Sequence, residues 1–68
     1  MRTWLKELRQ KNQLTQLQMA EKLEITESYY GLVEKGARQK KMNIVMISKL
    51  AEIFGISAQE IIKFETQN

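Results

Sequence analysis

The residues of this chain that could do chemistry are mainly cations. Lys35, Arg38, Lys40 and Lys41 lie within one short segment of the 68-residue sequence. Such a cluster can clamp the phosphates of an anionic partner, although a charged run is often only a solvated loop. Over the whole chain, 11 lysines and arginines against 8 acidic residues give a net charge of +3. This balance is compatible with an anionic partner and does not require one.

The sequence contains no cysteine and no histidine, two of the side chains that most often carry nucleophilic or metal chemistry. Thiol nucleophiles, disulfides and the usual nitrogen and sulfur ligands of zinc are therefore excluded. No glycine-rich phosphate loop and no paired carboxylates in an evident cleft are present either. We expect no enzyme activity, no metal, no cofactor and no small-molecule ligand.

The length predicts a single domain over residues 1–68. No apolar run approaches the roughly 18 residues that span a bilayer, and the first residues, Met1-Arg2-Thr3-Trp4, lack the apolar stretch of a signal peptide. We therefore expect a cytoplasmic protein with no membrane contact.

Apolar residues recur at helical spacing from end to end, without proline and without a strand-like alternation. This pattern predicts an all-α fold, a compact bundle of five short helices. Capping boxes are predicted at Thr15 with Gln18 and at Ser57 with Glu60, and simple N-caps at Thr26 and Asn43. Gly36 and Gly55 are expected to end helices. The predicted helices cover about residues 3–11, 16–23, 27–35 and 44–54, followed by a short helix after Ser57.

Helical spacing also predicts which residues are buried. In the second helix the predicted buried face is Leu17, Ala20 and Leu23, with Met19 at its edge. The fourth helix is expected to bury Ile44, Ile47, Leu50, Ala51 and Phe54, and to leave Val45, Met46 and Ile53 outside.

The third helix should present one face to solvent. Tyr30 and Val33 define its buried direction, so the opposite side collects Ser28, Gly31, Leu32 and Lys35, with Glu27 on the flank. The serine can donate or accept a hydrogen bond, the leucine can make an apolar contact, and Glu27 can accept from an amino group of a partner. Each also has a plainer explanation: Glu27 favours the positive end of a helix, a surface serine is solvated, and single exposed leucines are common.

The short break between the second and third helices predicts a helix-turn-helix at about residues 16–35. The segments LKELRQKNQLTQLQMAEKLEITESYYGLVEKG (residues 5–36) and ISKLAEIFGISAQEII (residues 47–62) resemble the Cro and phage-repressor class of DNA-binding proteins, the XRE family. The chain departs from that pattern in three places: Glu24 replaces the usual turn glycine, the loop after Gly36 is longer, and Met42 stands where proline is frequent.

The resemblance implies roles for particular residues. Its base-reading positions fall on Glu27, Ser28 and Leu32, and its phosphate-binding position falls on Gln16. Arg9 and Glu34 match a pair that forms a structural salt bridge in the family, the alternative being two independent surface charges. Beside these, the location of the cations predicts a backbone clamp. The expected phosphate-binding residues are Gln16, Tyr29, Lys35, Arg38, Lys40 and Lys41.

The last two helices carry more apolar residues than a small bundle needs, which predicts a homodimer. We expect an interface formed by Ile53, Ile61, Ile62 and Phe64. In the alternative, Phe64 and Ile61 fold back onto Trp4 and complete a monomeric core. A two-fold dimer would place two reading helices about 34 Å apart on a palindrome-like operator in double-stranded DNA.

These expectations combine into a sequence-specific DNA-binding transcriptional regulator, located at the nucleoid. A repressor that occludes a promoter is favoured, because we expect no segment left over for recruiting polymerase or sensing a ligand. Two alternatives use the same fold: an antitoxin-type or other protein-interaction module, and a controller of a restriction-modification system.

Overall fold

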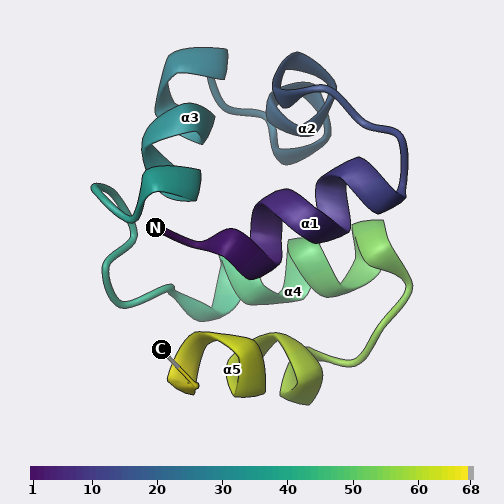
Figure 1. The fold of residues 1–68 in the computed structure, drawn as a ribbon, viewed down its shortest axis with the longest axis vertical. Helices are drawn as coiled ribbons and strands as arrows, with labels where there is room; N and C mark the ends of the chain where they lie inside the picture. The colour runs from purple at the N-terminus through teal and green to yellow at the C-terminus, as the bar shows by residue number, and fades with distance from the viewer. Residues whose placement is uncertain (68) are drawn as a thin grey trace.

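Five α-helices follow the predicted periodicity in the computed structural model, which describes residues 1–67 (Figure 1). The all-α fold is confirmed, and the helices begin and end where the sequence placed them. None of the helices within residues 1–67 combines the length and apolarity needed to cross a membrane. The helices are α1 (Thr3–Lys11), α2 (Gln16–Leu23), α3 (Glu27–Lys35), α4 (Ile44–Phe54) and α5 (Ala58–Thr66).

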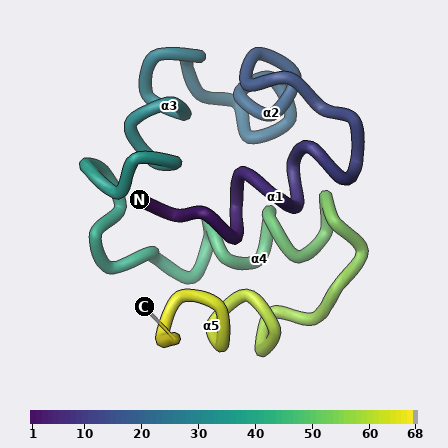
Figure 2. The backbone as a smooth tube through the Cα atoms, viewed as in Figure 1, coloured from purple at the N-terminus to yellow at the C-terminus, as the bar shows by residue number. Residues whose placement is uncertain are grey.

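The helices form two groups joined by α1. α2 packs against α3 at one end of the molecule, and α4 packs against α5 at the other (Figure 1). α1 lies between these pairs and contacts α3, while α2 also reaches α4. The backbone trace in Figure 2 shows the loop after α3 passing beside the N-terminus on its way to α4. This arrangement leaves the outer side of α3 and the outer side of α5 facing solvent on different parts of the surface.

Side-chain caps begin four of the helices. The Thr15 hydroxyl accepts a hydrogen bond from the Gln18 amide at 3.0 Å, and the Gln18 side chain accepts from the Thr15 amide at 2.8 Å, which confirms the first capping box. Thr26 and Asn43 cap α3 and α4 as predicted. The second capping box is only half formed, because Ser57 accepts from the Glu60 amide at 3.1 Å without a return bond within residues 1–67.

Left-handed residues end α2, α3 and α4. Gly36 at φ 80° and Gly55 at φ 66° adopt this conformation without a steric penalty. Glu24 ends α2 at φ 60°, although its Cβ opposes a left-handed backbone by about 1 kcal/mol. The turn between α2 and α3 therefore carries a small strain that a glycine would remove.

The core differs from the sequence-based prediction in α2 and α4. Met19 is completely buried and Leu17 is 50% exposed, because the face centred on Met19, Ala20 and Leu23 points about 100° away from Leu17. In α4, Met46 is only 7% exposed because it lies one turn before the buried Leu50 on the same face. The core residues are Leu5, Met19, Ala20, Leu23, Tyr30, Val33, Met46, Leu50, Ala51 and Ile61.

Ile44 was predicted to be buried and is instead 77% exposed. It is the first residue of α4, directly after the Asn43 cap, and lies at the edge of the buried face. Val45 is exposed as predicted. The start of α4 therefore presents two neighbouring aliphatic side chains to solvent.

The assignment of Ile61 to a dimer interface is wrong. Its side chain is fully buried in the core, so it offers no surface to a partner. Phe64 stacks on Trp4 with 5.5 Å between the ring centroids, and Ile53 is partly buried against the core. α5 thus folds back onto α1, as the monomeric alternative described. Of the four residues proposed for the interface, Ile62 remains exposed, at 45%.

Candidate nucleic-acid interface

The connection between α2 and α3 is a tight, hydrogen-bonded turn. Glu24 reverses the chain at the end of α2, and the Ile25 amide donates to the Ala20 carbonyl at 3.0 Å. Ile25 packs on the core from within the turn, and the Thr26 hydroxyl then caps α3. Because the turn is hydrogen-bonded to α2 through Ile25 and to α3 through Thr26, it holds the two helices at one relative angle.

Glu34 is the centre of a buried polar cluster that joins three helices. The Arg9 guanidinium of α1 donates to its carboxylate, with 2.6 Å between Nε and Oε2. The Tyr30 hydroxyl donates to the same carboxylate at 2.6 Å, and the Gln16 amide of α2 donates at 3.2 Å. The predicted Arg9–Glu34 ion pair is therefore present, and Arg9 also donates to the Leu14 carbonyl at 2.9 Å. The cluster fixes α3 against both α1 and α2.

The environment of this cluster shifts the ionisation of its members. Burial opposes ionisation of Glu34, but the hydrogen bonds from Arg9, Tyr30 and Gln16 outweigh it and lower the pKa of the carboxyl group. The hydrogen bond to Glu34 raises the pKa of Arg9, and burial followed by that same carboxylate raises the pKa of Tyr30. At neutral pH the Glu34 carboxylate and the Arg9 guanidinium are in direct contact, and the neutral Tyr30 hydroxyl and Gln16 amide also donate to the carboxylate.

The outer side of α3 presents the residues predicted to read bases. Glu27 and Ser28 are exposed, and Leu32 is partly exposed. Gly31 lies among them, and a Cβ added there would meet its nearest neighbour, the Gln16 side-chain oxygen, at 3.9 Å. That is an ordinary van der Waals distance, so the fold itself does not require glycine at this position.

The residues predicted to bind phosphate fall into two groups. Lys35, Arg38, Lys40 and Lys41 are all exposed at the end of α3 and in the loop that follows it. Gln16 is only half-exposed, because its amide is engaged by Glu34. Tyr29 is also half-buried, and its hydroxyl accepts a hydrogen bond from the Gln39 side chain at 3.2 Å. The cations are thus free to meet an anion, whereas Gln16 and Tyr29 are held in place by neighbours.

This geometry can be compared with known families. A family model described as a helix-turn-helix domain, of the XRE-like type, matches residues 4–65. The chain belongs to this helix-turn-helix family. Comparison with curated proteins gave no match, and comparison with solved structures gave none either.

Members of the helix-turn-helix family are DNA-binding modules, and the second helix of the motif is the one that enters the major groove. In this chain that helix is α3. The buried cluster around Glu34 lies on its inner side, and the polar residues Glu27 and Ser28 lie on its outer side. The same helix is therefore fixed to the protein by one face and open to a partner at the other.

Sequence reasoning missed Arg2, which is buried and organises the helix-turn-helix domain from its first residues. Its backbone amide donates to the Glu34 carbonyl at 2.7 Å, and its guanidinium donates to the Val33 carbonyl at 2.6 Å and the Arg38 carbonyl at 3.0 Å. The same guanidinium forms an ion pair with Glu65 of α5. An arginine next to the N-terminus carries no sequence signal for this role, because its acceptors, three backbone carbonyls and the Glu65 carboxylate, are brought together only by the fold.

Proposed function

We propose that this protein is a sequence-specific transcriptional regulator that binds double-stranded DNA with α3 in the major groove. The observation that carries the proposal is that the inner face of α3 is buried and hydrogen-bonded to the rest of the protein, whereas its outer face is polar and exposed. Glu27, Ser28 and Leu32 on the outer face offer an acceptor, a hydroxyl and an apolar contact to base edges. The helix-turn-helix family supplies the docking geometry.

Affinity would come mainly from the cations beside α3. Contacts to phosphate position a protein on DNA without reading its sequence, and each one releases counterions. These cations are exposed at the end of α3 and in the loop that follows it: Lys35, Arg38, Lys40 and Lys41. We assign them to the phosphates that flank the groove, together with Gln16 at the first turn of α2, where helix dipoles favour anions.

Repression by occlusion is the simplest mode of action for such a protein. A bound domain prevents access to a promoter by occupancy, so the mechanism needs only the DNA-binding surface. Control would then follow from the concentration of the protein itself.

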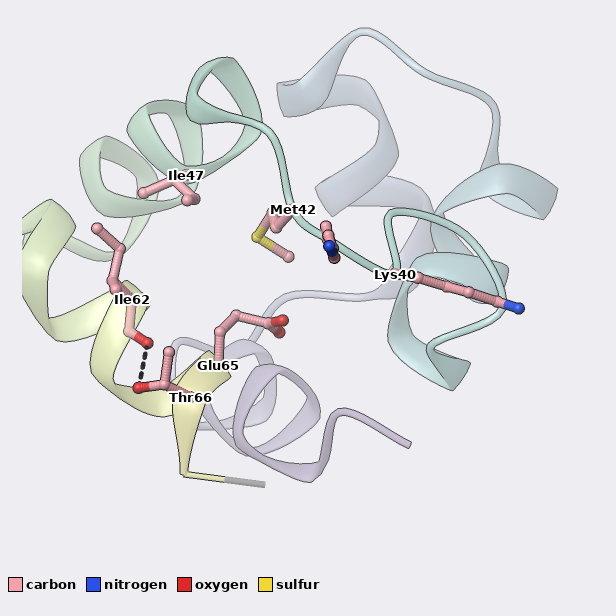
Figure 3. Close-up of a pocket in the computed structure, with 7 residues that line it drawn as sticks. Lys40, Met42, Ile47, Ile62, Glu65 and Thr66 are labelled. Atoms are coloured by element: carbon pink, nitrogen blue, oxygen red, sulfur yellow. Dashed lines mark hydrogen bonds between the residues drawn. The ribbon is translucent and has the colours of Figure 1, made fainter.

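The proposal includes a two-fold dimer, with an interface revised from the one predicted by sequence. Ile44 and Val45 at the start of α4 and Ile62 on α5 are exposed aliphatic residues. A pocket of about 280 Å³ lies between the two helices, and Figure 3 shows Met42, Ile47, Ile62 and Glu65 around it, with Lys40 directed away. Apolar groups beside charges of both signs suit a surface that must match its own copy.

Two experiments test the proposal. The first is selection from random duplex DNA, followed by titration of the enriched and scrambled duplexes at two salt concentrations. We expect a palindrome bound at least about a thousandfold more tightly than scrambled DNA. Replacing Lys40 and Lys41 should weaken binding to every duplex and reduce the salt dependence, whereas replacing Ser28 should change the preferred sequence. Weak, salt-sensitive binding to all duplexes would favour a protein-interaction role instead.

The second experiment is sedimentation of the wild-type protein and of Ile62→Glu. We expect concentration-dependent association in the wild type and a monomer of 8.0 kDa in the variant. Leu17→Glu is the matched control, because Leu17 is an aliphatic residue of similar exposure on α2. A wild-type protein that stays monomeric at high micromolar concentration would refute the dimer.

A further inference from the structure

Gln39, in the loop between α3 and α4, makes contacts that neither DNA reading nor core packing requires. It adopts a left-handed backbone at φ 54°, a conformation that opposes any residue with a Cβ. Its backbone carbonyl accepts a hydrogen bond from the Arg2 guanidinium. Its side chain bonds Tyr29 on one side and Asn43 on the other. One strained residue thus links the N-terminus, α3 and the start of α4.

The Asn43 contact determines which way the Gln39 amide faces. The backbone N–H of Asn43 can only donate, and it lies 3.1 Å from the Gln39 side-chain oxygen. The NH₂ end of the same amide must then point to Tyr29, whose hydroxyl oxygen lies 3.2 Å away. The Tyr29 hydroxyl is therefore an acceptor in this bond, and its own proton remains available for donation.

We infer that Gln39 is a positioning residue that presents the Tyr29 hydroxyl to a DNA phosphate as a hydrogen-bond donor. Tyr29 follows Ser28 on α3 and is half-exposed, and the cations Arg38 and Lys40 flank Gln39 in the chain. A phosphate held by these cations would meet a hydroxyl whose proton is still available for donation, because the hydroxyl only accepts in its bond to Gln39. This inference rests on the proposed function and assigns to it a residue that touches no DNA itself.

The test is a double-mutant cycle with Gln39→Gly and Tyr29→Phe. Glycine suits a left-handed backbone, so the first variant should fold while losing both side-chain hydrogen bonds. The probe is the enriched duplex from the selection or, if none is enriched, a random-sequence duplex at low salt. Each single substitution should raise the dissociation constant about tenfold for each protomer bound to the duplex, as expected for the loss of one hydrogen bond to a charged group. If Gln39 acts through Tyr29, the double variant should also be about tenfold weaker.

The salt dependence separates positioning from a displaced loop. A neutral hydroxyl releases no counterion, so Gln39→Gly should leave the slope of affinity against salt unchanged. Movement of Arg38 and Lys40 away from the DNA would reduce that slope. The matched control is Gln13→Gly, which changes the same residue type at φ 57° at an exposed position outside the contacts of Gln39. This control should bind DNA as the wild type does.

Three results would overturn the inference alone: wild-type binding by Gln39→Gly, a reduced salt slope in that variant, or a double variant about a hundredfold weaker. The last would mean that the two residues act independently. A wild-type protein that binds no duplex at all would refute the proposed function as well. The two failures are therefore distinguishable.

Discussion

Replacing Gly31 with alanine separates the stability of α3 from its use. Glycine in a helix interior is about 1 kcal/mol less favourable than alanine. The new methyl group would lie 3.9 Å from its nearest neighbour, the Gln16 side chain, so it meets no clash. The unfolding free energy should therefore rise by about 1 kcal/mol, which raises the melting temperature of a domain this size by roughly 4–8 °C.

DNA binding should change in the opposite direction. Gly31 lies on the outer face of α3, between Ser28 and Leu32 along the helix. If this face enters the major groove, an added methyl group holds the backbone away from the base edges. We expect Gly31→Ala to bind the enriched duplex at least about tenfold more weakly, which corresponds to about 1.4 kcal/mol. Binding to scrambled DNA depends on phosphates and should fall less.

Thermal unfolding followed by circular dichroism, and titration of both duplexes, give the two measurements. Ser48→Ala is the matched control, because it introduces alanine at an exposed position of α4, away from α3. It should raise stability modestly and leave DNA binding unchanged. A Gly31→Ala protein that is more stable and binds the enriched duplex like the wild type would refute close approach of α3 at this position. A less stable protein would show that the added methyl group does not fit beside the Gln16 side chain, contrary to the 3.9 Å contact distance.

Three other substitutions test the buried charges and the strained turn. The pKa of Glu34 is lowered in the folded protein, so the stability it contributes is complete above its ordinary value of 4.5 and is lost as the pH falls through the lowered value. Denaturant unfolding between pH 7 and pH 3 should show this loss. The Glu34→Gln protein should be less stable at neutral pH, and its unfolding free energy should depend less on pH. If the unfolding free energy of the variant fell with acid as steeply as that of the wild type, the assignment to Glu34 would be contradicted. Glu24→Gly should raise the unfolding free energy by about 0.5 kcal/mol, because relief of the left-handed strain exceeds the added entropy of the unfolded chain. The substitution also removes the exposed ion pair between Glu24 and Lys49, 3.6 Å apart, which contributes little to stability. Arg2→Ala should lower the unfolding free energy by about 2–3 kcal/mol in urea titrations, since it leaves buried acceptors unpaired; a change below about 0.5 kcal/mol would show that the N-terminus frays in solution.

The helix boundaries could be predicted because they are encoded locally. Caps such as Thr15, Thr26 and Asn43 act on amides three residues away, and Gly36 and Gly55 act on the turn in which they lie. The Arg9–Glu34 pair was found through the family pattern, although no local rule joins residues so far apart in the chain.

The errors arose where burial depends on packing between elements. Periodicity places Ile44 near the buried side of α4, but it cannot tell that the first turn extends past the core. The opposite error occurred for Ile61, which was assigned to the surface because α5 carries more apolar residues than one short helix needs. The structure uses this residue, with the Trp4–Phe64 stack, to attach α5 to the rest of the domain. Arg2 and Gln39 were missed because their partners converge only in the folded chain.

The two buried arginines hold the same turn of α3, one through a side chain and the other through the backbone. Arg9 bonds the side chain of Glu34, while Arg2 bonds the backbone carbonyls of Val33 and Glu34. Buried ion pairs add little net stability, because desolvation offsets much of their attraction. They do require one geometry, since each donor must meet its acceptor within hydrogen-bond distance. In a small domain with few core residues, this requirement fixes the end of α3 and the loop that carries Arg38, Lys40 and Lys41. It therefore sets the position of these proposed phosphate-binding residues relative to the outer face of α3.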